Sequence, residues 1–195
     1  MKYSTILLFG APGAGKGTQG KILGTIPGFF HFACGDAFRK LGINDPLAKI
    51  FIEYSSKGEL VPDEATIDLW GRNIKASTLD GSFDPEGDTL VLDGIPRNPN
   101  QARILQDTLN VKAVVHLTCQ DKDKMIQRLQ RRAFRENRLD DANLKVIKHR
   151  LDTYMEETKP VLDYYGHGLV HTVDSTQTPI HVLRDILAIV TKLVP

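Results

Sequence analysis

The sequence is poor in the features that mark secreted and membrane-bound proteins. Its only two cysteines, Cys34 and Cys119, lie far apart and form no Cys-x-x-Cys pattern, which argues against a disulfide framework and against a cysteine zinc site. No segment approaches the roughly 20 apolar residues that a membrane-spanning helix requires. The apolar stretch at residues 6–9 is too short for a signal peptide. We therefore expect a soluble protein of the reducing cytoplasm.

An excess of charge of one sign is also missing. The 25 Lys and Arg residues nearly balance the 24 Asp and Glu residues, which argues against a general binder of nucleic acids or membranes. Any anion site must therefore be built locally. The 195 residues, 41% of them hydrophobic, fit one domain with an ordinary core and room for small excursions.

Short apolar runs that alternate with helical patterns indicate the fold class. Strands are expected over residues 4–9, 30–33, 89–92, 113–117 and 169–173. Strands buried on both faces have continuous apolar runs, and strand–helix alternation implies right-handed crossovers, so we expect an α/β fold with a parallel sheet flanked by helices. Helices are expected over residues 19–23, 36–41, 45–56, 63–77, 101–109, 121–133, 141–164 and 179–193.

The glycine-rich stretch Gly10-Ala-Pro-Gly-Ala-Gly-Lys-Gly-Thr18 joins the first strand to the first helix. Glycines let backbone N–H groups turn toward a phosphate, the helix N-terminus adds positive potential, and Lys16 can reach the β- and γ-phosphates. The hydroxyl residue, Thr18, stands one position later than in the commonest form of this loop, because Gly17 follows the lysine. The residues expected to hold ATP phosphates are Gly13, Ala14, Gly15, Lys16, Gly17 and Thr18.

With its downstream motifs, this loop resembles the adenylate kinase family over essentially the whole chain. The motifs are Gly35-Asp36-Ala37-Phe38-Arg39, Gly58-Glu59-Leu60-Val61-Pro62-Asp63, Asp93-Gly94-Ile95-Pro96-Arg97 with Gln101, and Arg128, Arg132, Arg138, Asp140-Asp141 and Arg150. The resemblance implies a single P-loop kinase domain, residues 1–195, with a five-stranded parallel sheet. It also implies a helical monophosphate-binding insertion at residues 35–63 and a short lid at residues 132–139, too short for a zinc-binding lid.

The resemblance implies a reversible, Mg²⁺-dependent transfer of the terminal phosphoryl group of ATP to AMP, giving two ADP. Several cations must converge to neutralise two nucleotides, and guanidinium suits this because it binds two phosphate oxygens at once. Asp93 would orient the water shell of Mg²⁺ without a direct metal site. By resemblance, the catalytic residues are Lys16, Asp93, Arg97, Arg132, Arg138 and Arg150, with Arg128, Arg132 and Gln177 on the ATP side. We expect a monomer without nucleic-acid or membrane partners.

Choice of the acceptor base depends on fewer residues. Gln101 favours AMP, because its carbonyl and amide groups can pair with adenine. Cys34 stands where the family usually has threonine, and Ile95 where it usually has an aromatic residue, so selectivity for AMP could be looser. The residues that the resemblance assigns to AMP are Cys34, Arg39, Glu59, Leu60, Val61, Gly94, Ile95, Pro96, Arg97, Gln101, Arg138 and Arg150.

Other interpretations remain open. A pyrimidine (UMP or CMP) or other nucleoside monophosphate kinase is the nearest rival, and a nucleotide-binding protein without catalysis is a remote one. A GTP-dependent switch would need an Asn-Lys-x-Asp motif, and the sequence has no Asn-Lys pair. The pair Asp140-Asp141 could either cap the following helix or hold the lid arginines. His31 is interpreted as structural, because the chemistry requires no imidazole.

Overall fold

The computed structural model describes residues 2–136, 138, 141 and 143–193. At its centre lie five parallel strands, β1 (Tyr3–Gly10), β2 (Phe29–Ala33), β3 (Thr89–Asp93), β4 (Leu109–Thr118) and β5 (Val170–Asp174), in the order β2-β3-β1-β4-β5. All five predicted strands are confirmed. Parallel neighbours cannot be joined by tight turns, so the connections run through helices on both faces of the sheet.

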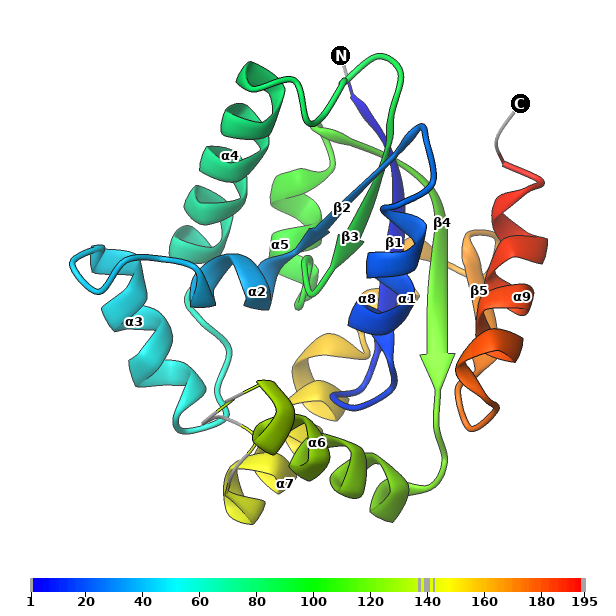
Figure 1. Cartoon of the computed structure of the whole chain (residues 1–195). Coiled ribbons are helices and arrows are strands. Elements are labelled where there is room, and N and C mark those ends of the chain that lie inside the picture. The colour runs from blue at the N-terminus through cyan, green and yellow to red at the C-terminus, as the bar shows by residue number, and fades with distance from the viewer. Residues whose placement is uncertain (1, 137, 139–140, 142, 194–195) are drawn as a thin grey trace.

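Alternate residues of β1 point into two different hydrophobic cores. Ile6 and Leu8 pack on one face with side chains of α1 (Lys16–Leu23) and α9 (Pro179–Val190). Leu7 and Phe9 pack on the other face with α4 (Asp63–Leu79) and α5 (Pro99–Leu105), and Figure 1 shows these helices on opposite sides of the strands. A sheet covered on both faces explains the continuous apolar runs in the sequence.

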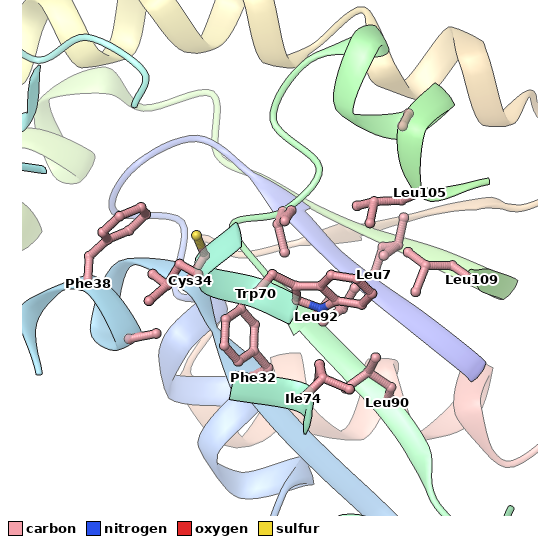
Figure 2. Packing of buried hydrophobic residues seen from close by; sticks show 14 of the residues in the cluster. Leu7, Phe32, Cys34, Phe38, Trp70, Ile74, Leu90, Leu92, Leu105 and Leu109 are labelled. Carbon is pink, nitrogen blue, oxygen red and sulfur yellow. The ribbon is translucent and has the colours of Figure 1, made fainter. Parts of the chain in front are cut away.

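The core between α4 and the sheet is built round the single tryptophan. Trp70 is 6% exposed and lies among Phe32, Leu7 and Leu92 (Figure 2). Cys34 belongs to the same cluster and is 2% exposed. These side chains come from β1, β2, β3, α4 and the first residue of the helix that follows β2, so the cluster ties the sheet to the helices after β2.

Three helices separate β2 from β3: α2 (Cys34–Arg39), α3 (Pro46–Ser55) and α4. The Asp45 side chain caps α3 by accepting a hydrogen bond of 2.9 Å from Leu47 N, and Pro46 occupies the first helical position, where its missing N–H carries no penalty. In Figure 1, α3 lies beyond α2, away from the sheet. The long connection is therefore helical, as the sequence predicted.

The segment after β4 forms α6 (Lys122–Glu136), α7 (Leu144–Thr153), a π-helical turn (Tyr154–Thr158) and α8 (Val161–Tyr165). Met125 and Leu129 of α6 pack with Ile147 and Leu151 of α7 in a third apolar cluster. Figure 1 shows α6 and α7 next to the carboxyl end of β4. The predicted lid, residues 132–139, lies partly outside the described residues, which leave out 137 and 139. Within the described ranges, no helix is long and apolar enough to cross a membrane.

Two predicted helices are wrong in extent. The helix predicted over residues 141–164 is interrupted, because Lys159 N donates to Tyr154 O at 2.8 Å in a π-type turn and Pro160 cannot donate a backbone hydrogen bond. The helix predicted over residues 101–109 ends at Leu105, since Leu109 already pairs with Tyr3 in the sheet. Pairing of Leu109 with β1 therefore decides where α5 ends, and the local helical pattern of the sequence does not reveal that end.

Candidate active site

A cavity of about 540 Å³ lies at the carboxyl ends of the strands. It is bounded by the loop between β1 and α1, the ends of β2 and β3, the segment before α4, and the facing sides of α6 and α7. Ligand sites in open α/β sheets lie at this edge. The predicted site residues that line the cavity are Gly13, Ala14, Gly15, Lys16, Gly17, Thr18, Arg39, Glu59, Leu60, Asp93, Gly94, Pro96, Arg97, Arg128, Arg132, Arg138, Arg150 and Gln177.

The phosphate-binding loop has the backbone that its glycines allow. Gly13 and Gly15 have φ values of 83° and 99°, in the left-handed region that residues with a Cβ rarely adopt. Helix α1 begins directly at Lys16, so its N-terminal N–H groups face the cavity and favour an anion there. The Lys16 Nζ donates to Gly10 O at 2.7 Å and to Ala11 O at 3.3 Å. These contacts fold the ammonium group back over the loop.

Lys16 is half-buried among other charges. Desolvation lowers its pKa to about 8; the guanidinium groups of Arg97, Arg132 and Arg150 act in the same direction, and Asp93 opposes them. Burial and like charge both disfavour the ammonium form. An anionic phosphate bound in the loop would raise the pKa of Lys16 again, because its negative charge stabilises the ammonium form.

A buried carboxylate holds two of the predicted catalytic arginines. Asp141 is 0% exposed. Its Oδ2 accepts from Arg132 Nε at 2.7 Å and lies 2.6 Å from Arg132 Nη2, and its Oδ1 accepts from Arg150 Nη1. Of the two roles left open for Asp141, holding the arginines is confirmed. Asp140 lies outside the described residues.

A second carboxylate connects α2 with the predicted lid. Asp36 Oδ1 accepts from Arg138 Nη2 at 2.8 Å and from Arg39 Nη1 at 3.4 Å, while its Oδ2 lies 3.8 Å from Lys21 Nζ. Arg138 also pairs with Glu136 through Nε at 2.6 Å. The sequence motif contained Asp36 but gave no reason to pair it with Arg138, which is 102 positions away.

The remaining predicted arginines are oriented by backbone oxygens. Arg97 Nε donates to Gly94 O at 2.9 Å, which fixes its guanidinium at the end of β3. Arg128 Nη2 donates to Ser175 O at 3.0 Å, beside the turn after β5. Gln177 from this same turn donates to Asp185 Oδ2 at 2.8 Å. These contacts place Arg97 and Arg128 on different walls of one cavity.

Asp93 fits the requirements of a magnesium ion that arrives with ATP. It ends β3 and lines the cavity, and a Cβ on Gly17 would lie 3.5 Å from its Oδ2, so the carboxylate borders the phosphate loop. Among the described residues, no three His, Cys, Asp or Glu side chains gather as a metal cluster. Mg²⁺ typically uses one or two carboxylates together with phosphates and water, and one carboxylate beside the loop suits that chemistry.

Four residues predicted to contact AMP lie behind the cavity wall. Cys34, Val61, Ile95 and Gln101 are 2%, 8%, 1% and 1% exposed and do not line the cavity. Burial raises the pKa of the Cys34 thiol to about 11, and its side chain lies in the apolar cluster of Figure 2. Their contact with a nucleotide therefore stays a prediction that requires local movement.

A comparison with family models matches residues 8–169 to the family described as adenylate kinase. The chain belongs to the adenylate kinase family. It is 38% identical over 169 residues to an adenylate kinase of Parabacteroides distasonis, covering 84% of this chain and 85% of that protein. It is 36% identical over 195 residues to an adenylate kinase of a Cyanothece species, covering 96% and 95% of the two chains.

The adenylate kinase motifs left some cavity residues unassigned. Gln19 is 2% exposed and lines the cavity, and its Nε2 donates to Pro179 O at 3.0 Å. Arg131 and Arg135 also line the cavity, although both are exposed. They lie three and seven residues after Arg128 on α6, and this spacing, which puts residues on one helical face, was the signal that could have revealed them.

Proposed function

We propose that the chain catalyses the reversible, Mg²⁺-dependent transfer of the terminal phosphoryl group of ATP to AMP, which gives two ADP. The observation that carries this proposal is the convergence of Lys16 and six predicted arginines on one cavity. An oxygen of the AMP phosphate attacks the γ-phosphorus in line, the bond from that phosphorus to the β,γ-bridging oxygen breaks, and ADP leaves. Positioning and electrostatic stabilisation are what such a reaction needs from the protein.

The donor nucleotide is expected on the side of the phosphate-binding loop. Backbone N–H groups of residues 13–18 would hold its phosphates, and Lys16 would move from the carbonyl oxygens of Gly10 and Ala11 to the β- and γ-phosphates. Arg128, which donates to Ser175 O in the turn after β5, and Gln177 from the same turn both line the cavity. They would flank the rest of ATP. Arg132 would neutralise charge on the transferred group.

The acceptor is expected on the opposite side of the cavity. Arg39 and Arg97 would grip the AMP phosphate, while Arg138 and Arg150 would lie between the two nucleotides. Support comes from their common cavity and from the carboxylates that hold Arg138 and Arg150 in position. Guanidinium groups have five N–H donors, so an arginine paired with a carboxylate can still donate to phosphate.

Mg²⁺ is proposed as the cofactor that accompanies ATP. When bound, it would neutralise charge on the β- and γ-phosphates. Asp93 would hold its water shell from the end of β3, and Thr18 lines the same cavity. The residues of the chain thus supply orientation for the ion, and the nucleotide supplies most of the negative charge.

Closure of two segments would keep water from the γ-phosphate. The proposed monophosphate-binding insertion, residues 35–63, contains α3, which lies away from the sheet. The proposed short lid, residues 132–139, begins inside α6, whose last turn lines the cavity. We also propose a monomer of the cytoplasm, since one chain supplies all the cations named above and both cysteines are free thiols.

The decisive experiment measures initial rates of ADP formation from ATP, Mg²⁺ and a panel of AMP, CMP, UMP and GMP. AMP should be the fastest acceptor. The Lys16→Met variant should lose about 10²–10³-fold in rate, because one cation directed at the transition state is worth that much. Equal rates for wild type and variant would remove the catalytic assignment, and faster turnover of CMP or UMP would favour the pyrimidine kinase alternative.

A further inference from the structure

The side-chain amide of Gln101 is held at both ends. Its Oε1 accepts a hydrogen bond of 2.7 Å from the backbone N–H of Arg97, and its Nε2 donates to Asp63 Oδ1 at 2.8 Å. Asp63 is the first residue of α4, and Gln101 lies in the first turns of α5. Two segments that are far apart in the sequence therefore fix one amide group.

Asp63 is itself held by two more amides. Its Oδ1 accepts from Asn98 Nδ2 at 2.8 Å, and its Oδ2 accepts from Asn100 Nδ2 at 2.7 Å. Burial opposes the charge, but the hydrogen bonds from Asn100, Asn98 and Gln101 lower the pKa of Asp63 below its usual value. The carboxylate is therefore ionised at neutral pH and can only accept hydrogen bonds.

These partners exclude the flipped amide. If the oxygen and nitrogen of Gln101 exchanged places, Nε2 would meet the Arg97 N–H, and two donors would face each other. Oε1 would meet the Asp63 carboxylate, and two acceptors would face each other. Each contact would replace a hydrogen bond by repulsion between partly buried groups. The orientation is thus determined by the fold and does not depend on the ligand.

The fixed amide still has hydrogen-bonding capacity. Oε1 keeps a second lone pair, and Nε2 keeps a second hydrogen. The unused pair is one acceptor beside one donor, in a known order. A base with an exocyclic amino group next to a ring nitrogen acceptor complements this pair, as adenine does with N6 and N1. A 6-oxopurine offers the opposite order, a carbonyl acceptor next to a ring N–H.

We propose that Asp63 is a specificity-determining residue, which fixes the Gln101 amide so that the acceptor site selects an amino-substituted base over the corresponding oxo base. This inference rests on the proposed function, in which a monophosphate binds beside Arg97. Gln101 contacts the backbone of Arg97, does not line the cavity and is 1% exposed, so the base reaches it only after a local opening. The segment Gly58–Leu60 lines the cavity and leads directly to Asp63.

AMP and IMP are the matched probes, because adenine and hypoxanthine differ in this pair of groups alone. We would measure kcat/KM for both with saturating ATP and Mg²⁺, and Kd for both by titration calorimetry. The wild type should prefer AMP by at least 100-fold, since an oxo base leaves buried polar groups mispaired. Asp63→Asn keeps the shape but can meet Gln101 with either an oxygen or an N–H, so only the Arg97 N–H still opposes the flipped amide, and the preference should fall at least tenfold.

Two further variants make the test complete. Asn100→Ala removes one hydrogen bond from Asp63 Oδ2 without touching the Gln101 amide, and its AMP preference should stay within about threefold of wild type. Gln101→Leu should abolish most of the preference. Thermal unfolding followed by Trp70 fluorescence reports whether each variant is folded. If Asp63→Asn is not folded, Asp63→Ala replaces it, because it also removes the acceptor that holds Gln101 Nε2.

An unchanged AMP preference in folded Asp63→Asn, or in Gln101→Leu, overturns the proposal. A wild type that binds AMP and IMP equally also overturns it. Failure of the proposed function looks different, because it would appear as an absence of ADP formation with AMP in the wild type. The calorimetric Kd ratio still tests the base preference in that case.

Discussion

Removal of the Asp141 carboxylate should damage both the fold and the chemistry. Asp141 is fully buried and connects Arg132 of α6 with Arg150 of α7. The side chains of these arginines are 29% and 17% exposed, so water screens the three charges only in part. In Asp141→Ala, two guanidinium groups lose the anion that they share and repel each other across a cavity.

The expected loss follows from this burial. Removing one partner of a buried ion pair costs about 3–5 kcal/mol, and partial exposure of the two arginines reduces this to about 2–4 kcal/mol. For a chain of this length, a loss of about 3 kcal/mol lowers the melting temperature by about 6–12 °C. Misplacement of Arg132 and Arg150, the two cations proposed to stabilise the transition state, should lower kcat by about 10- to 100-fold.

The assay compares urea unfolding and initial rates for wild type, Asp141→Ala, Asp141→Asn and the control Asp152→Asn. Asp152 is an exposed carboxylate on α7, so its variant should change stability by less than about 0.5 kcal/mol. Asp141→Asn keeps one acceptor oxygen and should fall between wild type and Asp141→Ala. Wild-type stability together with wild-type kcat in Asp141→Ala would refute the idea that this carboxylate positions the arginines.

Two more predictions concern α1. Because the pKa of Lys16 is lowered from 10.5 to about 8, the unfolded chain binds a proton between these values that the folded protein does not, so the free energy of unfolding should rise with pH in this window. Urea unfolding of wild type and Lys16→Met should therefore diverge above about pH 8, and parallel curves would contradict the shift. A Cβ on Gly20 would lie 2.3 Å from His31 Nε2, so Gly20→Ala should destabilise by about 1–3 kcal/mol. His31→Ala should remove most of that loss, and strictly additive effects in the double mutant would exclude a direct clash.

The strands could be predicted because their burial leaves a direct mark on the sequence. Residues 89–92 and 113–117 are apolar at every position except Thr89 and His116, and the structure covers both faces of their strands with helices. Helix ends were predicted less well. Leu109 follows a helical pattern locally but pairs with Tyr3, and no local pattern reports a partner 106 positions away. Tertiary pairing overrides helix propensity at such positions.

Site residues could be predicted from the sequence where a motif leaves the residue a single chemical role. Lys16, Arg97 and Arg150 belong to such motifs, and all three line the cavity. The motifs did not reveal which acid holds which arginine, since the hydrogen bond that Arg138 donates to Asp36 depends on how two distant segments pack against each other. Burial of Gln101 behind the wall was hidden for the same reason.

The carboxylates explain how the protein tolerates so many cations in one cavity. Without nucleotides, the arginines would repel one another and the half-buried Lys16, whose pKa is lowered first by burial and further by the neighbouring guanidinium groups. Asp36 and Asp93 supply opposing charge from the cavity lining, and the buried Asp141 supplies it through its ion pairs with Arg132 and Arg150. Each guanidinium that donates to a carboxylate keeps further N–H groups, so a phosphate can bind without displacing the acid. The arginines can therefore be held in place before a nucleotide arrives, which is the condition for strong electrostatic stabilisation of a transition state.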